Sequence, residues 1–208
     1  MATFVLVHGG GHGGWCYRAV KRRLEAAGHE VFAPSLTGLA ERARSLSADV
    51  DLDFHIDDVV QLLRYWDLHD AIVVGHSYGG MVITGVGDRA AARVGKLVYL
   101  DAANPRNGES LVDVAGPVIE MTRPMGAVVD GVELVLLPAP GAAAFYGISD
   151  PADAAWADAR LTGHPWKCFA QKLQLTNEHR VWEIDTGHDL MITEPERVTA
   201  ALLEVATD

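Results

Sequence analysis

The sequence predicts one α/β domain in which a mainly parallel sheet is covered by helices on both faces. Short apolar, often β-branched runs alternate with segments of helical periodicity, which is typical of parallel strands joined by crossover helices. One such run leads at once into a glycine-flanked serine and then into a helical pattern. The 208 residues suffice for a sizeable core, so we predict a single domain over 1–208.

Strands and helices are assigned from these runs and from the residues that bound them. The predicted strands are 3–7, 30–33, 71–74, 97–100 and 181–184. Helices are predicted where apolar residues recur at helical spacing, over 15–27, 56–66 and 81–92 and from about 194. The segment 104–170 interrupts the alternation and holds seven of the nine prolines, so we interpret it as a lid inserted over the sheet.

The composition excludes some classes of partner. A net charge of −11 gives no attraction for a polyanion, so we do not expect nucleic acid as a partner. The N-terminus lacks the basic region of a signal peptide, and no run approaches the roughly 18 apolar residues of a membrane span. Two cysteines without metal or redox spacing fit reduced thiols in a cytoplasmic protein. A homodimer is compatible with the sequence.

The most specific motif is Gly-His-Ser-Tyr-Gly at 75–79, which lies between the strand 71–74 and the helix 81–92. A G-x-S-x-G motif in this context is a nucleophile elbow, a turn so tight that its flanking residues must be small. The turn exposes the hydroxyl of Ser77 above the sheet at the N-terminal end of the next helix. Ser77 is therefore the candidate nucleophile.

A glycine-rich loop, His-Gly-Gly-Gly-His-Gly-Gly at 8–14, follows the first strand. Glycines there let backbone N–H groups face a developing negative oxygen, with the amide of Tyr78 as the second donor. The glycines at 9, 11 and 14 also fit the G-x-G-x-x-G pattern of a dinucleotide site. That alternative requires an acidic residue at the end of the second strand to bind the ribose, and none stands there.

His8 and His12 raise the question of a metal site. They lie four residues apart in a glycine loop, not on a helix, and the sequence places no third ligand nearby. We interpret them as packed or loop-stabilising histidines, and we predict neither a metal nor a nucleotide cofactor.

His188 is the candidate general base. It stands in Asp-Thr-Gly-His-Asp at 185–189, between the last predicted strand and the last predicted helix. In a fold with a nucleophile elbow the base belongs there, last in the order serine, acid, histidine. A neutral imidazole suits this role because its unperturbed pKa lies near neutrality.

Together these segments resemble the plant methylesterase and hydroxynitrile lyase family of the α/β-hydrolase fold, with its bacterial esterase relatives. The residues that carry the resemblance are FVLVHGGGHGGWCY at 4–17, VVGHSYGGMV at 73–82, LVYLDA at 97–102, WADARLT at 156–162 and DTGHDLM at 185–191. The resemblance implies oxyanion amides from Gly10 and Tyr78, small ester substrates and no cofactor. The lyase branch has a lysine directly after its base, where this chain has Asp189, which favours an esterase.

One departure from the family concerns the acid of the catalytic triad. The family has a further strand before the last one, and the loop after that strand supplies the acid. Here 173–180 leads almost directly into the strand 181–184, and a parallel crossover needs about a dozen residues. Either the sheet lacks that strand, or 172–175 pairs antiparallel through a tight hairpin.

We propose Asp101 as the replacement acid. It follows the predicted strand 97–100 at the carboxyl edge of the sheet, where active-site groups of open parallel sheets collect. The order Ser77, Asp101, His188 is also that of the fold. The alternative is that Asp101 only braces the turn that follows it.

The sequence thus favours a serine hydrolase that cleaves small carboxylic esters through an acyl-enzyme. One alternative is a lyase or cyclase that uses the same serine and histidine to move protons. Another is a small-molecule binding protein without catalysis, because fold alone does not establish function.

Overall fold

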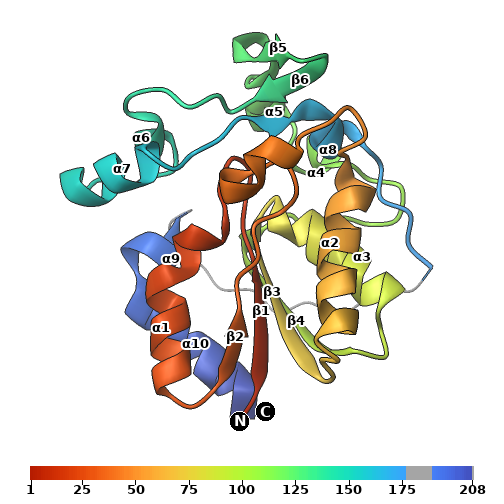
Figure 1. The fold of residues 1–208 in the computed structure, drawn as a ribbon, viewed down its shortest axis with the longest axis vertical. Coiled ribbons are helices and arrows are strands. Elements are labelled where there is room, and N and C mark those ends of the chain that lie inside the picture. Colours follow the sequence, from red (N-terminus) through yellow and green to blue (C-terminus); the bar gives the residue numbers. More distant parts are fainter. Residues whose placement is uncertain (177–188, 208) are drawn as a thin grey trace.

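The structure is a computed structural model that describes residues 1–176 and 189–207. Its main sheet has four parallel strands in the order β2-β1-β3-β4 (Figure 1). They are β1 (Thr3–Val7), β2 (Glu30–Phe32), β3 (Ala71–Ser77) and β4 (Val94–Ala102). The first four predicted strands are confirmed, although β3 and β4 extend further than their apolar runs. The predicted strand 181–184 lies outside the described residues.

Helices cover both faces of the sheet. The helices α1 (Arg18–Ala26) and α10 (Pro195–Thr207) pack together on one face, and α2 (Leu52–Tyr65) and α3 (Gly79–Arg89) pack on the other (Figure 1). The predicted first helix differs at its start, where the 3₁₀ turn η1 (Gly14–Tyr17) precedes α1. This is the layered architecture predicted from the sequence.

Each face of the sheet has its own hydrophobic core, because side chains alternate between the two faces along a strand. In β1, Val5 and Val7 belong to the core beneath α2 and α3, whereas Phe4 and Leu6 belong to the core beneath α1 and α10. All four side chains are fully buried, as expected for a central parallel strand.

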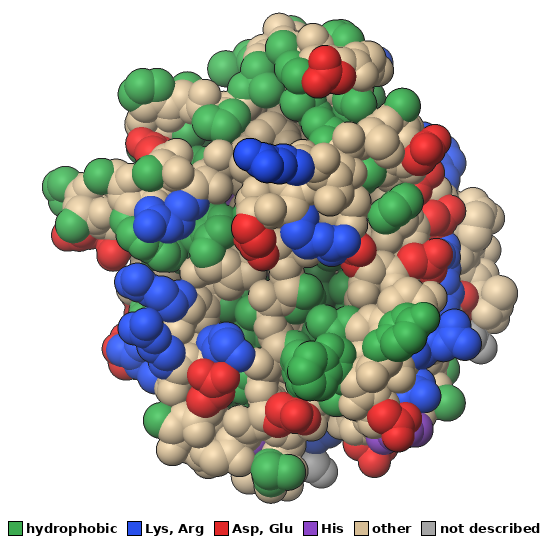
Figure 2. Space-filling model, viewed as in Figure 1, with side chains coloured by type: hydrophobic (Ala, Val, Ile, Leu, Met, Phe, Trp, Pro, Cys, Tyr) green, Lys and Arg blue, Asp and Glu red, His purple; other side chains and the backbone are tan. Residues whose placement is uncertain are grey.

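The segment 104–170 lies beyond the carboxyl ends of the sheet strands (Figure 1). We call it the lid segment. It contains α4 (Leu111–Ala115), α5 (Pro117–Glu120), η3 (Arg123–Met125), β5 (Ala127–Val129), β6 (Val132–Val135), α6 (Ala142–Phe145), α7 (Pro151–Asp158), β7 (His164–Pro165) and α8 (Trp166–Ala170). The strands β5, β6 and β7 form a small antiparallel sheet of their own. Figure 2 shows apolar side chains gathered at this end of the molecule, above a face with interspersed charges.

The residues just after the lid segment contact its start, and the alternative hairpin between 172–175 and 181–184 involves residues outside those described. Leu173 exchanges backbone hydrogen bonds with Gly108 and Glu109 at the start of the lid segment, at 2.8 and 2.9 Å. The short helix α9 (Leu190–Thr193) then precedes α10. Among the described residues, no helix is both long and apolar enough to cross a membrane.

Glycines set the distance between α3 and the sheet. A Cβ atom on Gly80 would lie 1.9 Å from the carbonyl oxygen of Ala103, a backbone atom that cannot easily move. A Cβ atom on Gly85 in the same helix would lie 2.3 Å from the Cδ1 atom of Ile56, the end of a flexible side chain. A methyl group on Gly80 would therefore have to displace backbone, whereas a methyl group on Gly85 would have to displace only a side chain.

We expect Gly80→Ala to lower the free energy of unfolding by more than about 2 kcal/mol, because the added methyl group forces the helix away from the backbone at Ala103. The matched variant Gly85→Ala should lose less than about 1 kcal/mol, because Ile56 can change rotamer and alanine favours the helix. Urea unfolding followed by circular dichroism measures both. Equal losses would show that this close backbone approach does not limit the fold.

Candidate active site

The turn around Ser77 has the geometry predicted for a nucleophile elbow. Ser77 ends β3 with a φ of +52°, and Tyr78 begins the turn into α3 directly afterwards. A non-glycine residue in this left-handed region is strained by about 1–3 kcal/mol, and such strain clusters at functional sites. A Cβ atom on Gly75 would lie 2.7 Å from the carbonyl oxygen of Gly79, which explains the small residues on either side of the turn.

Ser77 is partly exposed and opens into a cavity of about 290 Å³. The walls come from the elbow, the glycine-rich loop, the end of β4 and the lid segment. They are mainly apolar, with aromatic rings from Phe145, Tyr146 and Phe169 and aliphatic side chains from Leu111, Val114, Val118, Ile119 and Leu136. Such a pocket with few polar groups suits a small, largely apolar ligand.

Gly10 and Tyr78 line the same cavity as Ser77. Within the described residues, no hydrogen-bond acceptor engages the backbone N–H of Gly10 or of Tyr78. A Cβ atom on Gly10 would lie 2.9 Å from both Leu136 Cδ1 and Phe169 Cζ, so a side chain there would collide with the lid segment. The two predicted oxyanion donors are therefore brought together beside the predicted nucleophile.

Asp101 also faces this cavity, although its backbone differs from the prediction. It does not follow the strand but lies within β4 as a bulge, because His76 pairs with Leu100 and Ser77 pairs with Ala102. Its φ of +41° is the backbone signature of this bulge. The distortion turns a residue of the strand toward the pocket that contains Ser77, which the apolar pattern of 97–100 could not reveal.

His188, the predicted base, lies outside the described residues. Its neighbour Asp189 is buried, with 1% of its surface exposed, and its Oδ2 atom lies 3.2 Å from Nε2 of His12. The other carboxylate oxygen lies 3.6 Å from Nε2 of His76. Sequence reasoning missed this contact, because nothing in the spacing of residues 12, 76 and 189 joins them.

The two histidines of the glycine-rich loop stabilise it, as predicted. Nδ1 of His8 donates a hydrogen bond to the carbonyl oxygen of Gly9 at 2.9 Å, and its Nε2 accepts one from the amide of Leu36 at 3.0 Å. Burial lowers the pKa of His8 to about 3, so the ring is neutral. His12 donates through Nδ1 to the carbonyl oxygen of Gly10 at 2.8 Å.

The third glycine of the dinucleotide pattern has a packing explanation. A Cβ atom on Gly14 would lie 2.0 Å from the carbonyl oxygen of Ala33, just beyond β2. The amide of Gly14 donates to the hydroxyl of Ser35 at 2.8 Å, so that amide is not directed at a phosphate. Gly14 thus serves the contact between the loop and β2.

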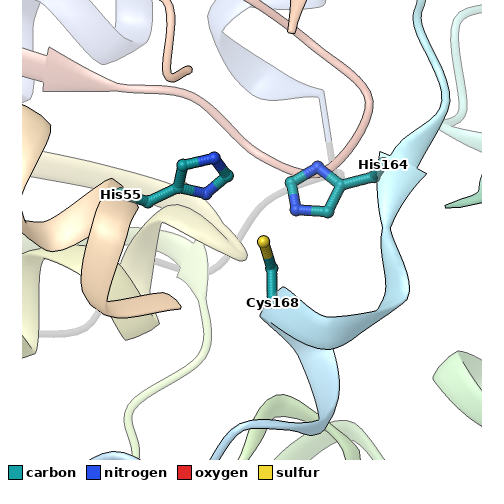
Figure 3. Close-up of side chains that lie close together, drawn as sticks. All are labelled: His55, His164 and Cys168. Atoms are coloured by element: carbon teal, nitrogen blue, oxygen red, sulfur yellow. The ribbon is translucent and has the colours of Figure 1, made fainter. Parts of the chain in front are cut away.

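A second group of side chains, absent from the sequence prediction, lies behind the oxyanion loop. His55, His164 and Cys168 point toward one another, and their potential ligand atoms lie within 4.8 Å of each other (Figure 3). All three are buried. Sequence reasoning missed this proximity, because α2 and the end of the lid segment bring together residues that are far apart in the chain.

The hydrogen bonds of this cluster disfavour metal binding. The amide of Gly11 donates to Nδ1 of His164 at 3.2 Å, so the neutral ring carries its proton on Nε2. Nε2 points into the gap between His55 and Cys168, and a metal there would require its lone pair (Figure 3). Both nitrogens of His55 are already engaged, by the hydroxyl of Tyr78 and the carbonyl oxygen of Thr37, each at 2.9 Å.

Comparison with known proteins identifies the family. The model of the alpha/beta hydrolase family matches residues 4–176. The chain belongs to the α/β-hydrolase family. Among solved structures, this α/β-hydrolase superposes on an extracellular α/β-hydrolase from a Paenibacillus species with a TM-score of 0.81 at 22% identity, covering 98% of both chains. It superposes on polyneuridine aldehyde esterase with a TM-score of 0.80 at 19% identity, covering 99% of both.

The predicted resemblance to plant methylesterases and bacterial esterases is also confirmed. The chain is 54% identical over 112 residues to the carbendazim hydrolyzing esterase of Nocardioides sp. (strain SG-4G), a match that covers 54% of this chain and 46% of that protein. It is 33% identical over 112 residues to Methylesterase 8 of Arabidopsis thaliana, covering 52% of this chain and 41% of the relative. The matches therefore span less than half the length of these relatives.

Three buried histidines should make this hydrolase sensitive to acid. Burial lowers the pKa of His8 to about 3, and it also lowers the pKa values of His55 and His164 below 6.5. The unfolded chain binds these protons near pH 6.5 while the folded chain does not, so this stabilisation is complete above pH 6.5 and decreases below it.

We expect the free energy of unfolding to fall between pH 6.5 and 5, by up to about 1.4 kcal/mol per pH unit for each of these three histidines. Urea unfolding at pH 7.5, 6.5, 5.5 and 5 measures the slope. A constant free energy of unfolding over this range would contradict neutral, buried rings.

Proposed function

We propose that this α/β-hydrolase cleaves small carboxylic esters through an acyl-enzyme formed on Ser77. The observation that carries the proposal is the strained elbow, which exposes Ser77 to an apolar cavity beside two amides without acceptors among the described residues. Its relatives include a carbendazim hydrolyzing esterase and several methylesterases, which supports the same class of reaction.

The reaction follows from the chemistry of these groups. Oγ of Ser77 attacks the ester carbonyl carbon while His188 accepts the hydroxyl proton. Negative charge develops on the carbonyl oxygen, where the amides of Gly10 and Tyr78 stabilise it. Collapse of the tetrahedral intermediate breaks the bond to the alcohol, which leaves with the proton from His188. Water then attacks the acyl-enzyme by the same route and releases the acid.

Asp101 is proposed as the group that orients His188. It shares the cavity with Ser77, and the bulge in β4 sets its direction. The task is to accept the Nδ1 proton of the base, hold one tautomer and stabilise the imidazolium. The proposed reaction uses no metal and no organic cofactor, because the serine, the base and the two amides supply every step.

The cavity favours esters that are small and mainly apolar. A volume of about 290 Å³ between aromatic and aliphatic walls suits a short acyl group and a compact alcohol.

Turnover of p-nitrophenyl acetate tests the proposal, and Ser77→Ala should reduce it at least about 10⁴-fold, because no nucleophile remains. The melting temperature should change little, since alanine fits the same tight turn. Mass spectrometry should detect an acetyl group on the wild-type chain only. Turnover without a trapped acyl-enzyme would favour the lyase or cyclase chemistry, and binding without turnover would favour a receptor.

The proposed acid predicts a second kinetic effect. Asp101→Asn should lower kcat by about 10²–10⁴-fold at an unchanged melting temperature, because an amide does not stabilise the imidazolium. Asp130→Asn makes the same change at another positive-φ position, which does not line the cavity, and serves as a control that should keep most activity. If kcat survives in Asp101→Asn, or falls only because the protein unfolds, Asp101 is structural and the enzyme acts with a serine–histidine dyad.

A further inference from the structure

We propose that His12, oriented by Asp189, is a positioning residue that aims the oxyanion donor Gly10. The inference rests on the proposed function, because it explains how one donor of that reaction is held in place. It assigns a role to a buried pair that the ester-cleavage mechanism does not otherwise use.

Hydrogen bonds with imidazole groups hold the peptide units on either side of Gly10. The unit between Gly9 and Gly10 carries the N–H of Gly10, a residue that lines the cavity, and its carbonyl oxygen accepts from Nδ1 of His8 at 2.9 Å. The next unit is held at both ends. Its carbonyl oxygen accepts from Nδ1 of His12 at 2.8 Å, and its N–H, on Gly11, donates to His164 at 3.2 Å.

Fixing both peptide units fixes the two backbone torsions of Gly10. Glycine has the widest choice of backbone torsions of any residue, so without these bonds its N–H would point in many directions. An oxyanion donor accelerates a reaction only when it already points at the position where charge develops. The imidazole groups thus replace the restraint that a side chain on Gly10 would otherwise supply.

The ring of His12 is itself held in one orientation by its neighbours. Its Nε2 atom lies 3.2 Å from Oδ2 of Asp189, and both side chains are buried to 1% exposure or less. Its ring stacks on Trp15 at 5.3 Å and meets the edge of Tyr146 at 4.7 Å. Because Asp189 holds one nitrogen and the aromatic rings hold the plane, the other nitrogen is directed at Gly10.

The residues His12 and Asp189 stand 177 positions apart in the chain. Their contact joins the oxyanion loop to the start of α9, directly after the position of the predicted base. A role limited to stability would require only that the contact with the buried carboxylate of Asp189 is kept. A positioning role requires in addition that the hydrogen bond to the Gly10 carbonyl is kept, and two substitutions of His12 separate these requirements.

The amide of asparagine lies about as far from the backbone as Nδ1, and that of glutamine about as far as Nε2. His12→Asn therefore keeps a donor for Gly10 and loses the contact with Asp189. His12→Gln keeps a donor for Asp189 and loses the bond to Gly10. His69→Gln makes the same change at an exposed site and serves as the control.

With p-nitrophenyl acetate, we expect His12→Gln to lower kcat by about 10–100-fold at an unchanged KM, with a melting temperature close to that of the wild type. His12→Asn should lower kcat by less than about 5-fold, yet reduce the melting temperature more, because the buried contact between residue 12 and Asp189 is lost. The proposal is overturned if kcat follows the melting temperature in both variants, or if kcat is the same in His12→Gln and His69→Gln.

A measurement without turnover keeps this inference separate from the proposed function. In protein labelled with [¹⁵N]glycine, the amide signals of Gly10 and Gly11 should shift, and exchange faster with solvent, in His12→Gln than in His12→Asn or His69→Gln. If the wild-type protein cleaves no ester, the proposed function fails and this experiment still decides the positioning role. Unchanged Gly10 and Gly11 signals in His12→Gln would overturn it.

Discussion

The turn at Ser77 is the constraint on which the rest of the site depends. A left-handed serine between β3 and α3 is possible only because its neighbours lack side chains that would meet the backbone at Gly79, Val7 and Ala103. The resulting close approach of α3 brings the elbow beside the glycine-rich loop after β1. It also couples the elbow to β4, through the hydrogen bond from the amide of Ala103 to the carbonyl oxygen of Ser77 at 3.0 Å. The cavity, the position of the Gly10 and Tyr78 amides beside it and the bulge at Asp101 are all part of this packing.

Buried imidazole groups hold the residues that line the site. His8 and His164 contact the peptide units of the oxyanion loop, and His55 accepts from the hydroxyl of Tyr78. Desolvation lowers the pKa of each ring, so all three act as neutral groups with one donor and one acceptor. A neutral ring can orient a backbone amide without adding a charge that would compete with the developing oxyanion. The histidines that hold the loop are therefore different residues from His188, the proposed base.

The sequence allowed the layers of the fold and the elbow to be predicted, because both depend on local patterns. Apolar runs such as 71–74 identify strands, and glycines around Ser77 identify a turn whose geometry hardly varies. Contacts between distant segments could not be predicted. Nothing in the sequence indicates that His164 would reach the loop at Gly11, or that Asp189 would lie beside His12. The bulge at Asp101 was missed for a related reason, since register is set by the neighbouring strand and not by the apolar pattern.

The two ends of the lid segment are attached to the domain in different ways, and this affects which part can change without disturbing the glycine-rich loop. Its last part is bound to the glycine-rich loop at 8–14, because the amide of Thr162 donates to the carbonyl oxygen of Gly11 at 2.9 Å and His164 accepts from the amide of the same residue. Its earlier helices, α4 to α6, mainly contribute apolar side chains to the cavity wall. Substitutions within 111–146 should therefore reshape the cavity wall, whereas substitutions at Thr162 or His164 would also disturb the loop at 8–14.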